Sequence, residues 1–441
     1  MKGIDYMSQD YYILKTLNLK DKNIHFYEEF VKEETIKEKR CLVYQAYLTY
    51  IPEYCPKCGV CFDNKIEKHG FKNSLIKLPS VSKLNTYLSL NKQRYICNNC
   101  NRTFTCTTDI VNYGCNISNN TKHSIAVDLI KKRSEKDIAI DNNVSPNTVE
   151  RVIDSYYEID NKVYKRTLPE VLSFDEFKSV KSADGAMSFQ VCNGRNGKII
   201  DVVEDRKLNN LMRYFSRYSR ESRLNVKTIV IDMYTPYISL IKTMFPNALI
   251  VIDKFHLIEL ISRSLNKTRI QLMKKDKDNY NKLKRYWKNI LKSRFELNCS
   301  KWKKYPCFKH LTTERDIVNY LTSLDNQFEE TYQIYQDLLY AFQNNDFTVL
   351  ETTLKQNYNN HSEYMKTSIK TLKNYLEYIN NTFSTGYHNG YVEGNNNFIK
   401  VLKRIAFGFR SFTRFKARIM ICKGLISPKE KEVENLVNST S

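Results

Sequence analysis

The sequence has no long hydrophobic run and comparatively little negative charge. No apolar stretch approaches the ~18 residues needed to cross a bilayer, which argues against a membrane-spanning protein. The first residues, MKGIDYMSQDYY, carry acidic side chains and lack the apolar segment of a signal peptide. We therefore expect a soluble, intracellular protein, whose 12 cysteines are thiols or metal ligands and not disulfide partners.

Positive charge is what the chain has in excess. It holds 70 Lys and Arg against 48 Asp and Glu, which gives a net charge of +22. Such a balance makes a polyanion the expected partner, and nucleic acid the first polyanion to consider. The 31 Tyr and 22 Phe argue against a disordered basic tail.

Two pairs of cysteines have the spacing of a zinc site. The four residues are Cys55, Cys58, Cys97 and Cys100. Two C-x-x-C pairs supply four thiolates for a tetrahedral structural Zn²⁺. Each pair is followed by a residue that tolerates a left-handed backbone, Gly59 or Asn101, and a hairpin or two must occupy residues 60–96. Three further residues are possible substitutes as ligands: Cys61, His69 and Cys106.

Residues 121–157 have the pattern of a helix-turn-helix. A first helix over Lys122–Lys132 is followed by Ser134-Glu-Lys-Asp137, a capping-box-like start for a second helix. Ser145-Pro146 supplies an N-cap and a first-turn proline for a third helix. The open side of that helix carries donors suited to base edges and phosphates: Asn147, Thr148 and Arg151. The alternative is a three-helix packing module without DNA contact.

A strand–helix–strand unit over residues 227–256 is the centre of the chain. A β-branched run ends at Asp232, a helix follows, and a second apolar run ends at Asp253. This is the unit of a buried parallel sheet, whose reactive groups lie at the carboxyl ends of the strands. The two aspartates are therefore candidate metal ligands, although either one alone fits the start of an ordinary loop.

An earlier strand and a hairpin extend this sheet. We expect Val171–Phe174 to be a strand that ends at Asp175, and residues 186–203 to form a hairpin. A basic helix over about residues 208–218 then leads into the central unit. The resulting order, three strands, helix, strand, helix, strand, helix, is that of an RNase H-like sheet.

The stretch from Leu257 to Asn380 reads as helical throughout, with no strand-like alternation, and we interpret it as a helical insertion. Its two tryptophans, Trp287 and Trp302, lie in basic surroundings. Such aromatics are more typical of a core than of base stacking.

A polar stripe marks the helix that follows this insertion. Its members are Glu393, Asn397, Lys400 and Arg404. Their spacing of four, three and four residues puts them on one helix face, with Val392, Ile399 and Leu402 on the buried side. A carboxylate followed by an amide and two cations suits a metal ligand beside a phosphate backbone. A merely solvated helix face is the alternative.

These motifs together resemble a known family. CPKCG and CNNC, the helix-turn-helix, FDEF, IDM, FPNALIVIDKFH, and VEGNNNFIKVLKR followed by AFGFRSF are similar to motifs of the DDE transposases of bacterial insertion sequences, specifically the ISL-three type with an N-terminal zinc finger. The similarity runs through nearly the whole chain. Phe174 stands where the family usually has an aliphatic residue, a departure that does not touch the ligands.

The resemblance implies that Asp175, Asp232 and Glu393 form a catalytic, metal-binding triad. Two Mg²⁺ (or Mn²⁺) ions about 3.5–4 Å apart suit in-line displacement at phosphorus, and carboxylates are the hard ligands that hold them. Three converging carboxylates without metal repel one another. Asp253 and His256 resemble the Asp-x-x-His signature beside the second acid, and we expect them to support the ligands without binding metal.

The predicted fold is α/β, an RNase H-like catalytic core with a large helical insertion, preceded by a small zinc-binding module and a helix-turn-helix. The predicted division is an N-terminal segment (1–50), a zinc-binding domain (51–115), the helix-turn-helix (116–165), the first part of the catalytic core (166–260), the helical insertion (261–380), the last helices of the core (381–425) and a C-terminal tail (426–441).

The predicted function is DNA transposition, in which the protein binds the terminal inverted repeats of an insertion sequence and then cleaves and transfers DNA strands. The predicted cofactors are two Mg²⁺ (or Mn²⁺) and one structural Zn²⁺. We expect double-stranded DNA as partner, a homodimer or higher oligomer on that DNA, no membrane partner, and a place in the bacterial cytoplasm at the nucleoid. Two alternatives remain open: a non-catalytic zinc and helix-turn-helix regulator, and an RNase H-like nuclease without strand transfer.

Overall fold

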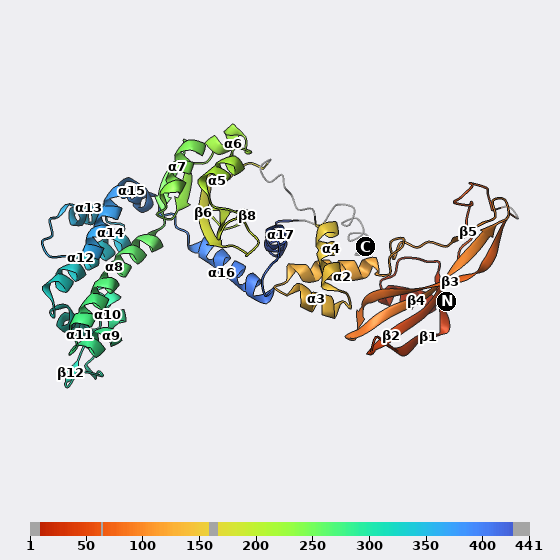
Figure 1. The fold of residues 1–441 in the computed structure, drawn as a ribbon, viewed down its shortest axis with the longest axis horizontal. Coiled ribbons are helices and arrows are strands. Elements are labelled where there is room, and N and C mark those ends of the chain that lie inside the picture. The colour runs from red at the N-terminus through yellow and green to blue at the C-terminus, as the bar shows by residue number, and fades with distance from the viewer. Residues whose placement is uncertain (1–8, 63–64, 158–165, 427–441) are drawn as a thin grey trace, which may run out of the picture. The chain divides into compact units, whose positions relative to one another are not determined.

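The computed structural model describes residues 9–62, 65–157 and 166–426 (Figure 1). The chain divides into two compact units, residues 1–160 with 400–441, and residues 161–399. The predicted tail from residue 427 onward lies outside the described residues. None of the described helices is both long and apolar enough to cross a membrane.

The first unit contains a sheet of long strands. Its elements are α1 (Gln9–Thr16), β1 (Ile24–Ile36), β2 (Lys39–Leu48), β3 (Ile66–Val81), β4 (Leu84–Cys97) and β5 (Arg102–Thr105). The order is β1-β2-β4-β3, and β5 pairs with β4. The β3–β4 hairpin confirms the expected hairpin between the two cysteine pairs. Because β2 pairs with β4, the predicted boundary at residue 50 falls within one sheet.

The same unit holds a group of helices: α2 (Asn119–Ile130), α3 (Glu135–Asp141), α4 (Pro146–Tyr156) and α17 (Phe412–Cys422). The predicted cap of α3 is present, since the Ser134 side chain accepts a hydrogen bond from the Asp137 N–H. Pro146 occupies the first turn of α4 as expected, but Ser145 makes no side-chain cap. The helices enclose one apolar cluster, to which α17 contributes Ala417 and Ile421.

Helix α17 packs on α2, whereas the sequence-based division groups residues 381–425 with the catalytic core. The Arg418 side chain is only 1% exposed and donates hydrogen bonds to the carbonyls of Leu129, at the end of α2, and Arg133. A guanidinium at a helix C-terminus satisfies carbonyls that lack helical partners and complements the helix dipole. The sequence of α17 by itself does not indicate that this helix packs on α2.

The second unit is built on a mixed sheet. Its strands are β6 (Val171–Lys178), β7 (Met187–Asn193), β8 (Ile199–Val203), β9 (Thr228–Ile231) and β10 (Leu249–Ile252), in the order β10-β9-β6-β7-β8. Strands β6, β7 and β8 are antiparallel neighbours, while β9 runs parallel to both β6 and β10. Between them lie α5 (Leu208–Phe215), α6 (Arg220–Leu224) and α7 (Thr235–Met244). The predicted succession of strands and helices is confirmed, with the added short α6.

Strand β6 is longer than predicted, so Asp175 lies within it and not at its end. The pairing with β7 continues to Lys178, which keeps the backbone extended. The pairing with β9 covers only Val171 to Ser173. Asp175 therefore still follows the last residue that is paired on the β9 side, where Asp232 lies.

Helices make up most of residues 254–385, apart from the stretch 292–313. They are α8 (Lys254–Lys275), α9 (Tyr280–Arg285), α10 (Trp287–Leu291), α11 (Glu314–Thr322), α12 (Asn326–Asn344), α13 (Phe347–Lys355), α14 (Glu363–Asn374) and α15 (Leu376–Thr385). The expectation of no strand is wrong in one place, where β11 (Lys303–Lys304) and β12 (Leu311–Thr312) pair. These strands are too short to show an alternating pattern. Helix α16 (Gly390–Ile405) follows α15.

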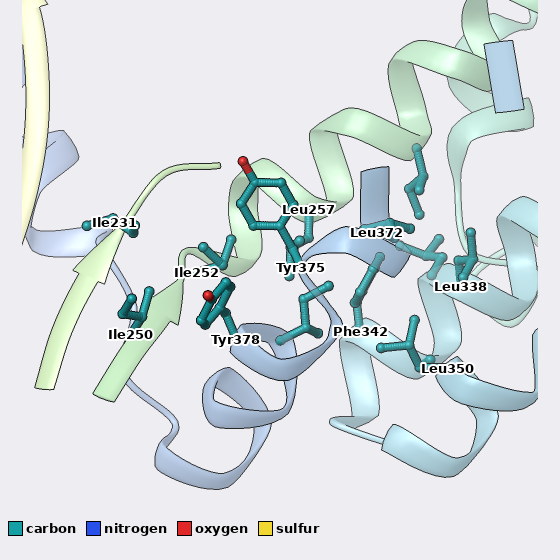
Figure 2. Packing of buried hydrophobic residues seen from close by; sticks show 14 of the residues in the cluster. Ile231, Ile250, Ile252, Leu257, Leu338, Phe342, Leu350, Leu372, Tyr375 and Tyr378 are labelled. Carbon is teal, nitrogen blue, oxygen red and sulfur yellow. The ribbon is translucent and has the colours of Figure 1, made fainter. Parts of the chain in front are cut away.

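The sheet and these helices share one hydrophobic core. Figure 2 shows Ile250 and Ile252 of β10 near Tyr378 of α15, with Leu338 and Phe342 of α12 further along the same cluster. Helix α8 is continuous across the predicted boundary at residue 260. The predicted helical insertion therefore supports the sheet directly, which positions the carboxyl ends of β9 and β10.

Candidate functional site

The four predicted zinc ligands come together in the first unit. One sulfur from each of Cys55, Cys58, Cys97 and Cys100 lies within 4.8 Å of every other. The Cys55 and Cys100 sulfurs are 3.8 Å apart, and those of Cys58 and Cys97 are 3.7 Å apart. A tetrahedral zinc with Zn–S bonds of about 2.3 Å has sulfur–sulfur edges of about 3.8 Å. The thiols therefore fit a zinc ion.

The backbone around the cysteines has the predicted form. Gly59 and Asn101 have φ values of +74° and +52°, and their N–H groups donate to the carbonyls of Cys55 and Cys97. A hydrogen bond from the Val60 backbone lowers the pKa of the Cys58 thiol to about 6, which favours a thiolate there. The possible substitutes lie outside the group of four: Cys61 and His69 are exposed, and Cys106 is buried.

A second group of candidate ligands lies at the carboxyl ends of β9 and β10. Asp232 follows β9, Asp253 follows β10, and His256 is in the first turn of α8; one ligand atom of each lies within 4.8 Å of the others. The Nε2 atom of His256 is 2.8 Å from Oδ1 of Asp232. This contact with Asp232 raises the pKa of His256. Asp175 and Glu393 are not members of this group.

The Asp175 carboxyl is mostly buried, and its charge is sensitive to Asp232. Burial first, and then the charge of Asp232, raise the pKa of Asp175 to about 7. The Oδ2 atom accepts a hydrogen bond of 2.6 Å from the side-chain amide of Asn396. Acidic groups that are costly to ionise together are stabilised by a cation placed between them. The carboxylates thus have the donor chemistry of a site for Mg²⁺ or Mn²⁺.

Asp253 has a structural partner of its own. It is 5% exposed, and its Oδ1 accepts a hydrogen bond of 3.0 Å from the backbone N–H of Asn389. Burial raises the pKa of Asp253. Asn389 is the residue whose carbonyl accepts the first helical bonds of α16, from Val392 and Glu393. Asp253 therefore ties the end of β10 to the start of α16.

Three asparagines attach α16 to the sheet, and the sequence reasoning did not assign them this role. Asn389 accepts from the Ser173 hydroxyl, Asn395 donates to the Gly197 carbonyl at 2.7 Å, and Asn396 accepts from Gln190 at 2.7 Å while donating to Asp175. Their signal in the sequence is weak. Asn395 and Asn396 lie next to the polar stripe, on turns that also carry the buried Val392 and Ile399.

The predicted stripe on α16 is exposed along its length. It consists of Glu393, Asn397, Lys400 and Arg404, while Val392, Ile399 and Leu402 are buried as predicted. Glu393 lies in the first turn of the helix. Its neighbours on either side, Asn389 and Asn396, both contact the aspartates.

The predicted DNA-reading residues lie on α4. Asn147 and Arg151 are exposed, and Thr148 is half-buried with its hydroxyl 3.1 Å from that of Ser145. Val149, Val152 and Ile153 are buried on the opposite side, as predicted. The helix therefore presents its polar side to solvent.

Comparison with known families agrees with this geometry. Residues 172–419 match the model of a transposase family, the ISL3 type of DDE transposase. Residues 52–100 match the zinc finger of the transposases of IS204, IS1001, IS1096 and IS1165. A zinc finger joined to a DDE domain, which implies an RNase H-like core, defines a metal-dependent transposase. The chain belongs to the ISL3 family of DDE transposases.

A curated relative matches a shorter stretch. A protein of Lactococcus lactis subsp. lactis, named an ATP-dependent protease, is 44% identical over 115 residues, which is 26% of this chain and 36% of that protein. The chain thus spans about a third of the length of this relative. The name describes that protein alone.

Proposed function

We propose that this transposase binds the terminal inverted repeats of an insertion sequence, cleaves DNA at them and joins the freed strand to target DNA. The observation that carries the proposal is the acidic cluster at the carboxyl ends of β9 and β10, within residues that match a DDE transposase domain. Hydrolysis and strand transfer are both in-line displacements at phosphorus, so one site serves both.

The proposed ligands of two Mg²⁺ or Mn²⁺ ions are Asp175, Asp232 and Glu393. When bound, such ions activate the attacking oxygen and stabilise the leaving oxygen. Asp175 and Asp232 come from neighbouring strands, and burial first, then the nearby charge of Asp232, raise the pKa of Asp175. The side-chain amide of Asn396 donates a hydrogen bond to Oδ2 of Asp175, and the backbone N–H of Glu176 donates one to Oδ1.

Support for Glu393 comes from its position on α16. The Asn396 side chain, three residues after it, donates to Asp175, and the Asn389 side chain, four residues before it, accepts from Ser173 on the same strand, while the Asn389 backbone N–H donates to Asp253. Side chains three and four residues apart lie on one side of a helix. The Glu393 carboxylate therefore starts from the side of α16 that is turned toward Asp175 and Asp253, and its exposure lets it rotate toward a bound cation.

Asp253 and His256 are proposed to position the ligands. Asp253 uses Oδ1 to hold the start of α16, one turn before Glu393. His256 holds an oxygen of Asp232 at 2.8 Å and orients the carboxylate. Partners of this kind typically change metal affinity or activity by 10–100-fold when removed.

DNA recognition is proposed for two helices. On α4, Asn147, Thr148 and Arg151 would contact base edges and phosphates, in the manner of a recognition helix. On α16, Asn397, Lys400 and Arg404 would contact the phosphate backbone near the catalytic acid. The net charge of +22 favours both contacts. We further propose that two or more copies act together on DNA, at the bacterial nucleoid.

The test uses the full-length protein and a labelled duplex that carries the repeats flanking its gene. With Mg²⁺, we expect cleavage at the repeat and joined products when target DNA is added. Asp232→Asn should bind the same duplex and yield neither product. Binding without any cleavage by the unaltered protein would support the regulator alternative, and cleavage without joining would support the nuclease alternative.

A further inference from the structure

The hairpin formed by β11 and β12 has no role in the proposed chemistry. Lys303 pairs with Thr312, and Lys304 pairs with Leu311. Figure 1 shows the hairpin at the end of the helices of the second unit that lies away from strands β6 and β8. It belongs to the stretch that the sequence predicted to be purely helical.

The loop that joins the two strands of the hairpin is fixed to the helices. The Tyr286 hydroxyl donates a hydrogen bond of 2.6 Å to the Pro306 carbonyl. The ring of Phe308 packs edge-on against Tyr286 and Tyr320, with centroids 5.7 Å and 5.6 Å apart. The hairpin is thus held in one orientation before any ligand arrives, which lowers the entropic cost of binding.

The exposed side of the hairpin is strongly basic. No acidic residue lies between Glu296 and Glu314 in the sequence. The same stretch contains four exposed lysines: Lys301, Lys303, Lys304 and Lys309. Glu314 is already paired with Lys292 at 3.0 Å, so it does not neutralise the hairpin. Within the described part of the chain, none of the four lysines has an ion-pair partner. A polyanion is the complementary partner.

Trp302 adds a flat apolar surface among these lysines. Trp302 is 62% exposed, and the nearby Leu311 is 61% exposed. The sequence pattern favoured a core position for both tryptophans, but Trp302 lies in solvent and Trp287 is 39% exposed. An exposed aromatic ring between cations suits a nucleobase stacked on the ring with its phosphates on the lysines.

We propose that the hairpin of residues 301–312 binds unpaired DNA, with Trp302 stacked on a base and the lysines on the phosphates. This inference rests on the proposed function, because strand cleavage generates nucleotides that leave the duplex. In a duplex the bases are stacked on one another and present no free face to a tryptophan. The arrangement therefore favours single-stranded over double-stranded DNA.

The chain contains two tryptophans, which gives a direct optical test. Full-length Trp287→Phe has Trp302 as its single tryptophan, and the matched Trp302→Phe has Trp287. Oligo-dT should quench the fluorescence of the first protein, reversibly with salt, and leave that of the second nearly unchanged. Equal quenching in both proteins, or none while labelled oligo-dT is seen to bind by anisotropy, would overturn the proposal.

A binding comparison separates this surface from end recognition. Trp302→Ala should weaken binding of oligo-dT about tenfold or more and leave binding of the duplex repeat unchanged. An equal loss on both DNAs, or no loss on either, contradicts the assignment. The Asp232→Asn protein should show the same quenching, because the hairpin readout does not need cleavage. If the proposed function fails while quenching persists, only the catalytic assignment is lost.

Discussion

Asp253 Oδ1 accepts a hydrogen bond of 3.0 Å from the backbone N–H of Asn389, 136 residues further along the chain. This single bond joins the end of a sheet strand to the first turn of the helix that carries Glu393. The distance between the acids of the site therefore depends on a residue that does not need to touch metal. We propose on this basis that Asp253 has a role different from that of Asp232.

The two aspartates should differ in mutational effect. Asp232→Ala is expected to eliminate Mg²⁺-dependent cleavage, because it removes a proposed ligand. Asp253→Ala should leave detectable activity, reduced about 10–100-fold. Single-turnover cleavage of end DNA measures both. Asp253→Asn is the matched variant, because its amide oxygen still accepts from Asn389. If Asp253 binds metal directly, Asp253→Asn should be as inactive as Asp232→Ala.

Zinc content should depend on the four-cysteine group. We expect one Zn²⁺ per chain in the purified protein, and loss of that zinc in Cys58→Ser, because a tetrahedral structural site needs all four thiolates. Elemental analysis by mass spectrometry measures this. Cys61→Ser, close by in the sequence but outside the group, should keep its zinc. Full retention in Cys58→Ser would place the zinc elsewhere.

End binding should be separable from catalysis. Arg151→Ala should weaken binding to the terminal repeat by about 1–3 kcal/mol if its guanidinium contacts a base edge. Glu393→Gln should bind nearly as the unaltered protein does and cut no DNA, because the substitution removes charge from a proposed ligand. Gel-shift titrations at fixed salt, paired with cleavage assays, give both quantities. Cleavage by Glu393→Gln would exclude Glu393 as the third acid.

The metal-free protein should lose stability as pH rises from about 4 to about 7. Burial and Asp232 raise the pKa of Asp175 from 3.8 to about 7, so the folded state holds a proton that the unfolded state has released. Where the folded state binds more protons, the free energy of unfolding falls with increasing pH. Denaturation in EDTA measures this slope.

Asp175→Asn provides the control for this pH effect, because it removes the titrating group while keeping an oxygen near the Asn396 amide. The slope between these pH values should be smaller in Asp175→Asn than in the unaltered protein. Mg²⁺ should stabilise the unaltered protein more than the variant at pH 7, since the cation offsets the repulsion of the carboxylates. Identical slopes would contradict the raised pKa.

Arg418→Met should loosen the helices of the first unit. It leaves the carbonyls of Leu129 and Arg133 without their buried donor, at a cost of about 1–3 kcal/mol per group. Hydrogen exchange of residues 119–130 should accelerate, while exchange of residues 228–252 stays unchanged. Arg414→Met is the matched control on the same helix; it removes a partly exposed pair with Glu150 and should have little effect. Equal acceleration in both variants would argue against a special role for Arg418.

Much of the fold could be predicted because its signals are local. The strand–helix alternation around Asp232 and Asp253, the capping residue Ser134 and the left-handed positions Gly59 and Asn101 all follow from a few neighbouring residues. The cysteine spacing identified the zinc ligands because metal binding demands a fixed number of sulfurs.

The remainder depends on contacts between distant segments. The extension of β6 past Asp175 is set by its pairing with β7, and the asparagine contacts of α16 are set by where that helix meets the sheet. Trp302 is exposed because it lies at the start of the β11–β12 hairpin. The strands of this hairpin are too short to produce an alternating pattern in the sequence. In the sequence, an asparagine that donates to a carboxylate of the sheet, as Asn396 does, looks like any polar residue on a helix.

The position of α17 has a consequence for how the protein is made. The apolar core of α2, α3 and α4 is closed by Ala417 and Ile421, which the ribosome adds only after the whole of residues 161–399. Domains generally fold as units during synthesis, N-terminal segments first. Here the second unit is complete in sequence before the first unit can finish its helical core. In a nascent chain, the second unit can therefore fold before the helical core of the first unit is closed by α17.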